Sequence, residues 1–215
     1  MRGPWEIADP FTNPVADHAV REALKALASP GSFYSGAERV AMAEHVRVSR
    51  GLASSAQTTT VLSQPERGAV SRVAVEAMNT READVAAWKR DGRDVRAYVE
   101  LVAVVALTTS IDSYRIACGG PLDPLPDPLP GGPIPVVDDA AVRTNSLVPT
   151  VGAAIPKTAL SALPDEAKVI DMLAGAFYID GPVHRFDDPD PDEPLLRSQI
   201  ELVAARVSLL NECFF

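Results

Sequence analysis

The sequence predicts an all-α protein built from two related helical halves. Apolar residues recur at helical spacing in most segments, and no segment shows the strict apolar–polar alternation or the hairpin dipeptides that are typical of strands. A proline-rich segment separates the helical stretches. The chain has 215 residues, of which 47% are hydrophobic, and this is enough for one large domain or two small ones.

Three amphipathic helices are predicted near the N-terminus. The first covers residues 16–29 and ends at Pro30, because proline disrupts the continuation of a helix. A second begins near Ser35 and runs to Gly51, and a third covers residues 66–78. Each places its apolar residues three or four positions apart, so each is expected to turn one face towards a shared core.

The most apolar stretch, residues 94–118, is predicted to be a buried helix at the core. Its length and its lack of breakers favour a helix over a strand despite several valines. Cys118 at its end is interpreted as a small buried hydrophobe, and its functional alternative is a disulfide with Cys213. Residues 119–156 contain nine prolines, which prevent a helix, so this segment is predicted to be a linker or an arm that lies along the surface.

Helical patterns return after the prolines. They cover residues 158–163 and 165–178, and the last predicted helix runs from Pro194 to the end of the sequence. The acidic residues 187–193 are interpreted as a solvated connection. The chain is therefore predicted to divide into a first helical half, a proline-rich arm and an incomplete second half, which are residues 1–118, 119–156 and 157–215.

Charge and composition exclude several classes of function. The formal net charge is −9 and Lys and Arg do not cluster, which argues against a nucleic-acid partner. No apolar run approaches the roughly 20 residues that span a membrane, and the N-terminus lacks the basic start and apolar core of a signal peptide, so we expect a cytoplasmic protein.

The residue types that hold metals and nucleotides show no recognised spacing. Two cysteines in the whole chain fit a reducing compartment. Neither metal-ligand spacing nor a nucleotide-binding motif occurs, so no cofactor is expected. The three histidines are scattered and are interpreted as surface or capping residues: His18, His45 and His184.

A short internal repeat connects the two halves. Residues 96–103 and 197–204 are identical at Arg, Glu, Leu, Val and Ala with a constant offset, since 197 − 96 = 101. At the same offset Cys213 falls opposite Asp112, so only the second copy retains a thiol at this position. A match of this length also arises by chance between two apolar helices, and duplication is the favoured interpretation.

Each copy carries one glutamate at the same point of an apolar helix. Glu100 and Glu201 are costly to bury unless they are paired or functional. The alternative for each is an ion pair on its own helix face, with Arg96 or Arg197 respectively.

The end of the sequence resembles a known signature. In alkylhydroperoxidase D-like proteins of the carboxymuconolactone decarboxylase family, a glutamate is followed by an apolar helix, an Asn-x-Cys turn, two residues, a second cysteine, three residues and a histidine. Residues 201–215 are similar to the first part of this pattern, and Glu201 and Cys213 have its spacing, since 213 − 201 = 12. Residues 98–130 resemble the first half of the tandem members of the family.

The resemblance implies a fold, an activity and a site. The fold would be an alkylhydroperoxidase D-like helical bundle, and the activity would be the reduction of small hydroperoxides by a thiol or selenol. Glu201 matches the glutamate of the family's proton relay, and Cys213 matches the cysteine that resolves the oxidised intermediate. A homo-oligomer and a thiol protein as reductant are expected, with no nucleic-acid or membrane partner. The alternative is a non-catalytic helical module for oligomerisation or binding.

The second cysteine and the histidine of the family pattern match nothing before the sequence stops at Phe215. Three explanations stay open: the sequence is cut, the protein is a degenerate non-catalytic relative, or the next codon is a stop signal recoded as selenocysteine. The 215-residue chain is expected to lack thiol-dependent peroxide turnover, because a resolving cysteine alone cannot form the intrachain disulfide.

Overall fold

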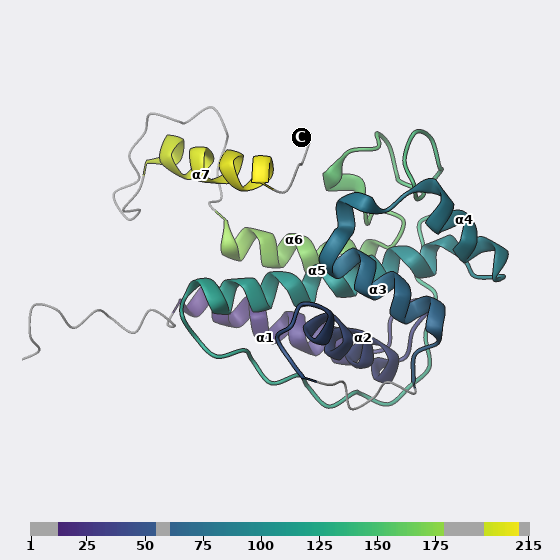
Figure 1. Cartoon of the computed structure of the whole chain (residues 1–215), viewed down its shortest axis with the longest axis horizontal. Helices are drawn as coiled ribbons and strands as arrows, with labels where there is room; N and C mark the ends of the chain where they lie inside the picture. Colours follow the sequence, from purple (N-terminus) through teal and green to yellow (C-terminus); the bar gives the residue numbers. More distant parts are fainter. Residues whose placement is uncertain (1–12, 55–60, 179–195, 211–215) are drawn as a thin grey trace, which may run out of the picture. The chain divides into compact units, whose positions relative to one another are not determined.

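The computed structural model describes residues 13–54, 61–178 and 196–210, and every regular element in them is a helix (Figure 1). The prediction of an all-α protein is therefore confirmed. The chain forms two units, Met1–Phe177 and Tyr178–Phe215. The elements of the described residues, in chain order, are α1 (Pro14–Ala28), α2 (Gly36–Ser49), α3 (Gln64–Glu76), the 3₁₀ helix η1 (Ala77–Asn79), α4 (Glu82–Arg90), α5 (Val95–Ala117), the 3₁₀ helix η2 (Pro156–Thr158), α6 (Pro164–Phe177) and α7 (Arg197–Leu210).

Side-chain caps set the starts of the first three helices. Asn13 accepts two backbone N–H groups of the first turn, so α1 begins at Pro14, two residues earlier than predicted. Ser35 and Ser63 cap α2 and α3, each in a capping box with the glutamate three residues later. These caps fix the first residues of α2 and α3, and the two helices pack against each other.

α5 is the centre of the first unit. It contacts α1, α2, α3, α4 and α6, and Figure 1 shows it running alongside α6. The prediction of a buried helix over residues 94–118 is confirmed to within one residue at each end. Its fully buried apolar side chains include Val99, Leu101, Val104, Leu107 and Ile111.

α4 is a described helix that apolar periodicity does not predict. It has nine residues and buries only Val85 and Trp88, three positions apart, so its sequence pattern is weak. Trp88 anchors it: the indole Nε1 donates a hydrogen bond to the carbonyl of Asp94 at 2.8 Å, and the ring packs edge-on against Tyr98 at 5.4 Å.

The proline-rich segment is part of the first unit, and two backbone hydrogen bonds attach it there. The backbone N–H of Leu129 donates to the carbonyl of Ala28, and that of Ile134 donates to the carbonyl of Gly31, each at 2.9 Å. These bonds attach the arm to the last residue of α1 and to the loop that follows it. They also satisfy backbone carbonyls at the end of α1 and just after it.

The second part of the proline-rich segment forms turns. Val142 and Thr150 form an isolated antiparallel bridge, and η2 follows. The prediction of a helix over residues 158–163 is wrong, since turns follow η2 up to Pro164. The hydroxyl of Ser161 explains part of the difference, because it bonds to the backbone at Val151 and at Thr158 and so competes with helical hydrogen bonds.

α6 packs within the first unit, against α1 and α5. It begins with Pro164 in its first turn, followed by two acidic residues, as the sequence predicts. Leu173 is buried in the core. The predicted division at residues 118 and 156 concerns duplication of the sequence and stays a prediction.

The second unit contains α7. None of the described residues of α7 is buried, although many are apolar. Residues 194–195 and 211–215 of the predicted last helix lie outside the described residues. In the parts of the chain that the structure describes, no helix combines the length and apolar character that crossing a membrane requires.

Candidate functional site

Glu201 lies in the second turn of α7, in a small polar group of the second unit. The Tyr178 hydroxyl donates to Glu201 Oε2 at 2.8 Å, and Arg197 Nε donates to Oε1 at 2.6 Å. The hydrogen bond from Tyr178, and then that from Arg197, hold the pKa of the Glu201 carboxyl below its ordinary value. Glu201 is therefore an ionised and partly exposed carboxylate at neutral pH.

Cys213 lies outside the described residues. The pairing of Glu201 with Cys213 stays a prediction. The described part of the connection is helical from Glu201 to Leu210, which is the conformation that the family pattern requires between its glutamate and its first cysteine.

Glu100 is the counterpart of Glu201 in the first copy, and it is fully buried. Arg39 Nη1 of α2 donates to Glu100 Oε1 and to Glu166 Oε1 of α6, at 2.6 Å in each case. Arg39 Nη2 also donates to Glu166 Oε2 at 3.1 Å. The backbone N–H of Phe33 donates to the second oxygen of Glu100 at 2.6 Å. Every carboxylate oxygen in this cluster therefore has a protein donor.

Two carboxylates share one guanidinium in this cluster, so it holds one excess negative charge when all three groups are ionised. Burial raises the pKa of Glu100, and Arg39 opposes this change without cancelling it. Burial also disfavours the charge on Arg39, but Glu166 and Glu100 outweigh burial and raise the pKa of the guanidinium. The cluster joins α2, α5 and α6 and is a structural centre of the first unit.

Gly31 makes room for this cluster. A Cβ atom at this position would overlap Glu100 Oε1 and Arg39 Nη1. The sequence interpretation of Pro30 and Gly31 as a helix end is correct. Gly31 has a second role, which is to leave space for the cluster. This role depends on residues far away in the sequence, so no local pattern indicates it.

Asp112, the counterpart of Cys213, is also fully buried and paired. Arg47 of α2 binds it with two hydrogen bonds, from Nη2 to Oδ1 at 2.7 Å and from Nε to Oδ2 at 3.1 Å. Arg47 Nη2 also donates to the backbone carbonyl of Asp123 at 2.9 Å, at the start of the arm. The carboxylate thus fixes α2, α5 and the arm together.

The predicted local partner of Glu100 is wrong. Arg96 pairs with Asp94 at 2.6 Å, whereas Glu100 pairs with Arg39, 61 positions away in the sequence. In the second copy the corresponding local pair does form, between Arg197 and Glu201. Glu100 therefore lies in the core, whereas Glu201 is partly exposed.

Cys118 caps the C-terminal end of α5 and is half-buried, not fully buried as predicted. One turn earlier, Tyr114 stacks on Phe177 of α6 with ring centroids 4.3 Å apart. The predicted functional alternative for Cys118, a disulfide with Cys213, lies outside the described residues.

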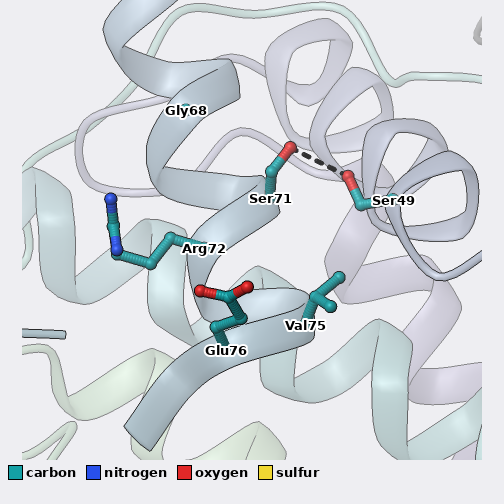
Figure 2. A pocket seen from close by; sticks show the side chains of 6 residues that line it. All are labelled: Ser49, Gly68, Ser71, Arg72, Val75 and Glu76. Atoms are coloured by element: carbon teal, nitrogen blue, oxygen red, sulfur yellow. Dashed lines mark hydrogen bonds between the residues drawn. The ribbon is translucent and has the colours of Figure 1, made fainter. Parts of the chain in front are cut away.

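His45 is half-buried and bonded, and is not a capping residue. Its Nε2 atom lies 2.9 Å from Ser71 Oγ of α3, and Ser71 Oγ lies 2.9 Å from Ser49 Oγ of α2. Figure 2 shows Ser49 and Ser71 facing each other beside a pocket. The sequence contains no motif that indicates this group.

Within the described residues, no three side chains of metal-binding type gather into a metal site. No model of a protein family, no curated protein and no solved structure matches the chain. The class of the protein is therefore inferred from its own residues.

Proposed function

We propose that this protein is an alkylhydroperoxidase D-like thiol or selenol peroxidase whose reactive centre lies in the second copy and includes Glu201 and Cys213. The contrast between the two copies carries the proposal. Glu100 and Asp112 are buried and fixed by arginines of α2, whereas Glu201 at the matched position is partly exposed.

The first copy is unsuited to acid–base chemistry. A carboxylate that accepts hydrogen bonds on both oxygens inside the core can exchange a proton only if the surrounding ion pairs open. Glu201 also accepts a hydrogen bond on each oxygen, but its side chain is 30% exposed and its partner Tyr178 is exposed, so a proton can reach this carboxylate from solvent. The ionised carboxylate can take up a proton and pass it on through Tyr178 or water, although its lowered pKa makes it a weaker base than an ordinary glutamate.

The proposed reaction follows from the family resemblance. A thiolate or selenolate three positions after Cys213 attacks the hydroperoxide, the O–O bond breaks, and the alcohol leaves with a proton delivered through Glu201. The attacking group becomes a sulfenic or selenenic acid. Cys213 then attacks it, so a disulfide or selenosulfide forms and water leaves. A thiol protein reduces this bond by exchange, which places the protein in a reducing compartment such as the cytoplasm.

The reactivity of Cys213 tests this proposal. In a Cys118→Ser variant Cys213 is the only cysteine, so the rate of its alkylation by monobromobimane can be followed as a function of pH. The variant is made in a chain extended to complete the family pattern, with serine in place of the second cysteine, because in the family the helix whose positive end favours the thiolate follows this cysteine. We expect the alkylation midpoint to lie clearly below about 8.5, the value for an unperturbed cysteine. A midpoint at or above this value would contradict the proposal.

A non-catalytic module for self-association is the second candidate, and α7 favours it. Its large apolar side chains are more than half exposed, as at Leu202, Val203, Leu209 and Leu210. Such a surface is typical of a helix that packs against a partner, and we propose a second copy of this chain as that partner. An ordinary alkylation midpoint for Cys213, together with a dimer in light scattering, would favour this candidate.

A further inference from the structure

α2 and α3 hold His45 against Ser71, and Ser71 lines a pocket of about 390 Å³. Figure 2 shows its lining, which comprises Ser49, Gly68, Ser71, Arg72, Val75 and Glu76. The group is distinct from Glu201 and Cys213, and nothing proposed above uses it.

Two packed helices fix the geometry of this group. His45 and Ser49 lie four positions apart on α2 and so occupy one face of that helix. Ser71 lies opposite them on α3. Its single hydroxyl contacts both His45 Nε2 and Ser49 Oγ at 2.9 Å, so it has one partner that can take its proton and one that can donate to it.

The imidazole of His45 is in the protonation state that a base needs. Burial holds the pKa of His45 below its ordinary value of 6.5, although a hydrogen bond with the backbone carbonyl of Arg67 acts in the opposite direction. The ring is therefore neutral at pH 7. The carbonyl of Arg67 can only accept a hydrogen bond, so it orients the ring as the third group of a serine–histidine arrangement does.

We propose that Ser71 is a nucleophile, with His45 as its base, and that the pocket takes a small neutral ester. Ser71 Oγ attacks the carbonyl carbon while its proton passes to His45 Nε2. The bond from carbon to the leaving oxygen then breaks, and His45 returns the proton to it, which leaves an alcohol and an acyl group on Ser71. A water molecule, deprotonated by His45, releases the acid and restores the serine.

The lining of the pocket supports this substrate class. Arg72, the next residue of α3, lines the pocket, and Figure 2 shows its side chain extending away from Ser71, so it does not donate to the negative charge that develops on the carbonyl oxygen. Arg72 Nε lies 3.4 Å from Asp84 Oδ1, and Glu76 adds a second carboxylate to the lining, so the pocket favours an uncharged ligand over an anion. Gly68 leaves the space one turn before Ser71 open, because no heavy atom lies within 4 Å of a Cβ atom built there.

A fluorophosphonate probe tests the assignment on the full chain. Attack by Ser71 Oγ on phosphorus breaks the P–F bond, releases fluoride and leaves the proton on His45. We expect peptide mapping by mass spectrometry to place the label on Ser71. Ser71→Ala should abolish the label, and His45→Gln should slow labelling by about 100-fold or more, the usual contribution of a general base. Ser113→Ala, at an exposed serine of α5, should label like the unaltered protein.

Two results would overturn the proposal. One is the absence of label on Ser71 in the folded, unaltered protein. The other is an equal labelling rate in a His45→Gln variant whose circular dichroism matches that of the unaltered protein. If either substitution prevents folding, the position of the label in the unaltered protein tests the proposal, because only Ser71 is expected to carry the label.

Discussion

Replacement of Arg39 by methionine is expected to lower the free energy of unfolding at pH 7.5 by about 3–5 kcal/mol. The substitution keeps most of the volume of the side chain but removes the only cation from between Glu100 and Glu166 in the cluster. Two carboxylates would then remain in the core without their main hydrogen-bond donor. Urea unfolding followed by circular dichroism at 222 nm measures the change.

The loss is expected to be smaller at pH 5 than at pH 7.5. Burial already raises the pKa of Glu100 above its ordinary value of 4.5, and Arg39 limits the rise. Without the guanidinium the folded-state pKa rises further, so the folded protein binds a proton more tightly than the unfolded chain. Stability is then gained as the pH falls through the folded-state pKa towards 4.5 and is lost as the pH rises through it.

A triple variant provides the control for this experiment. Arg39→Met combined with Glu100→Gln and Glu166→Gln removes all three charges, so most of the pH dependence should disappear and part of the stability should return. If Arg39→Met alone costs less than about 1 kcal/mol at both pH values, the cluster does not hold α2, α5 and α6 together.

The second large effect is expected at Asp112. Asp112→Ala should cost about 3 kcal/mol, because it leaves the buried guanidinium of Arg47 with only the carbonyl of Asp123. The estimate is at the low end of the range for buried pairs because the Arg47 side chain is 11% exposed and can recover some contact with water. The same unfolding assay measures this loss.

Two comparisons make the Asp112 experiment specific. Asp165→Ala removes the partner of Lys168 in a pair whose side chains are mostly exposed, and it should cost no more than about 0.5 kcal/mol. A double-mutant cycle with Arg47→Ala separates the pair from its surroundings. A coupling free energy near zero between Arg47 and Asp112 would contradict the conclusion that this pair holds α2, α5 and the arm together.

Much of the fold could be predicted because its helices are long and their apolar residues repeat regularly. α5 is the clearest case, since 23 residues with few polar positions can only be a buried helix. The start predicted near Ser35 agrees with the structure, and so does the start predicted from the proline and two acids at residues 164–166. α4 has too few apolar residues for its period to be detected.

The polar core could not be predicted in the same way. The partners of Glu100 and Asp112 lie 61 and 65 positions away, and local pairing rules reach only three or four residues. The need for glycine at position 31 follows from that same distant contact. The sequence does indicate that an acid inside an apolar helix needs a partner or a role. Glu100 is paired with Arg39 in the core, whereas Glu201 is bound by Tyr178 and Arg197 and is partly exposed.

Peroxide turnover by an extended chain tests the assignment of Glu201 and Cys213 most directly. The extension places a cysteine three positions and a histidine seven positions after Cys213, which completes the family pattern. With dithiothreitol as reductant, we expect this protein to consume cumene hydroperoxide faster than the dithiol alone. Glu201→Gln should lower kcat/KM by about 100-fold, whereas Glu100→Gln, at the matched buried position of α5, should retain turnover. A folded extended protein without turnover, or with turnover that Glu201→Gln leaves unchanged, would contradict the proposed function.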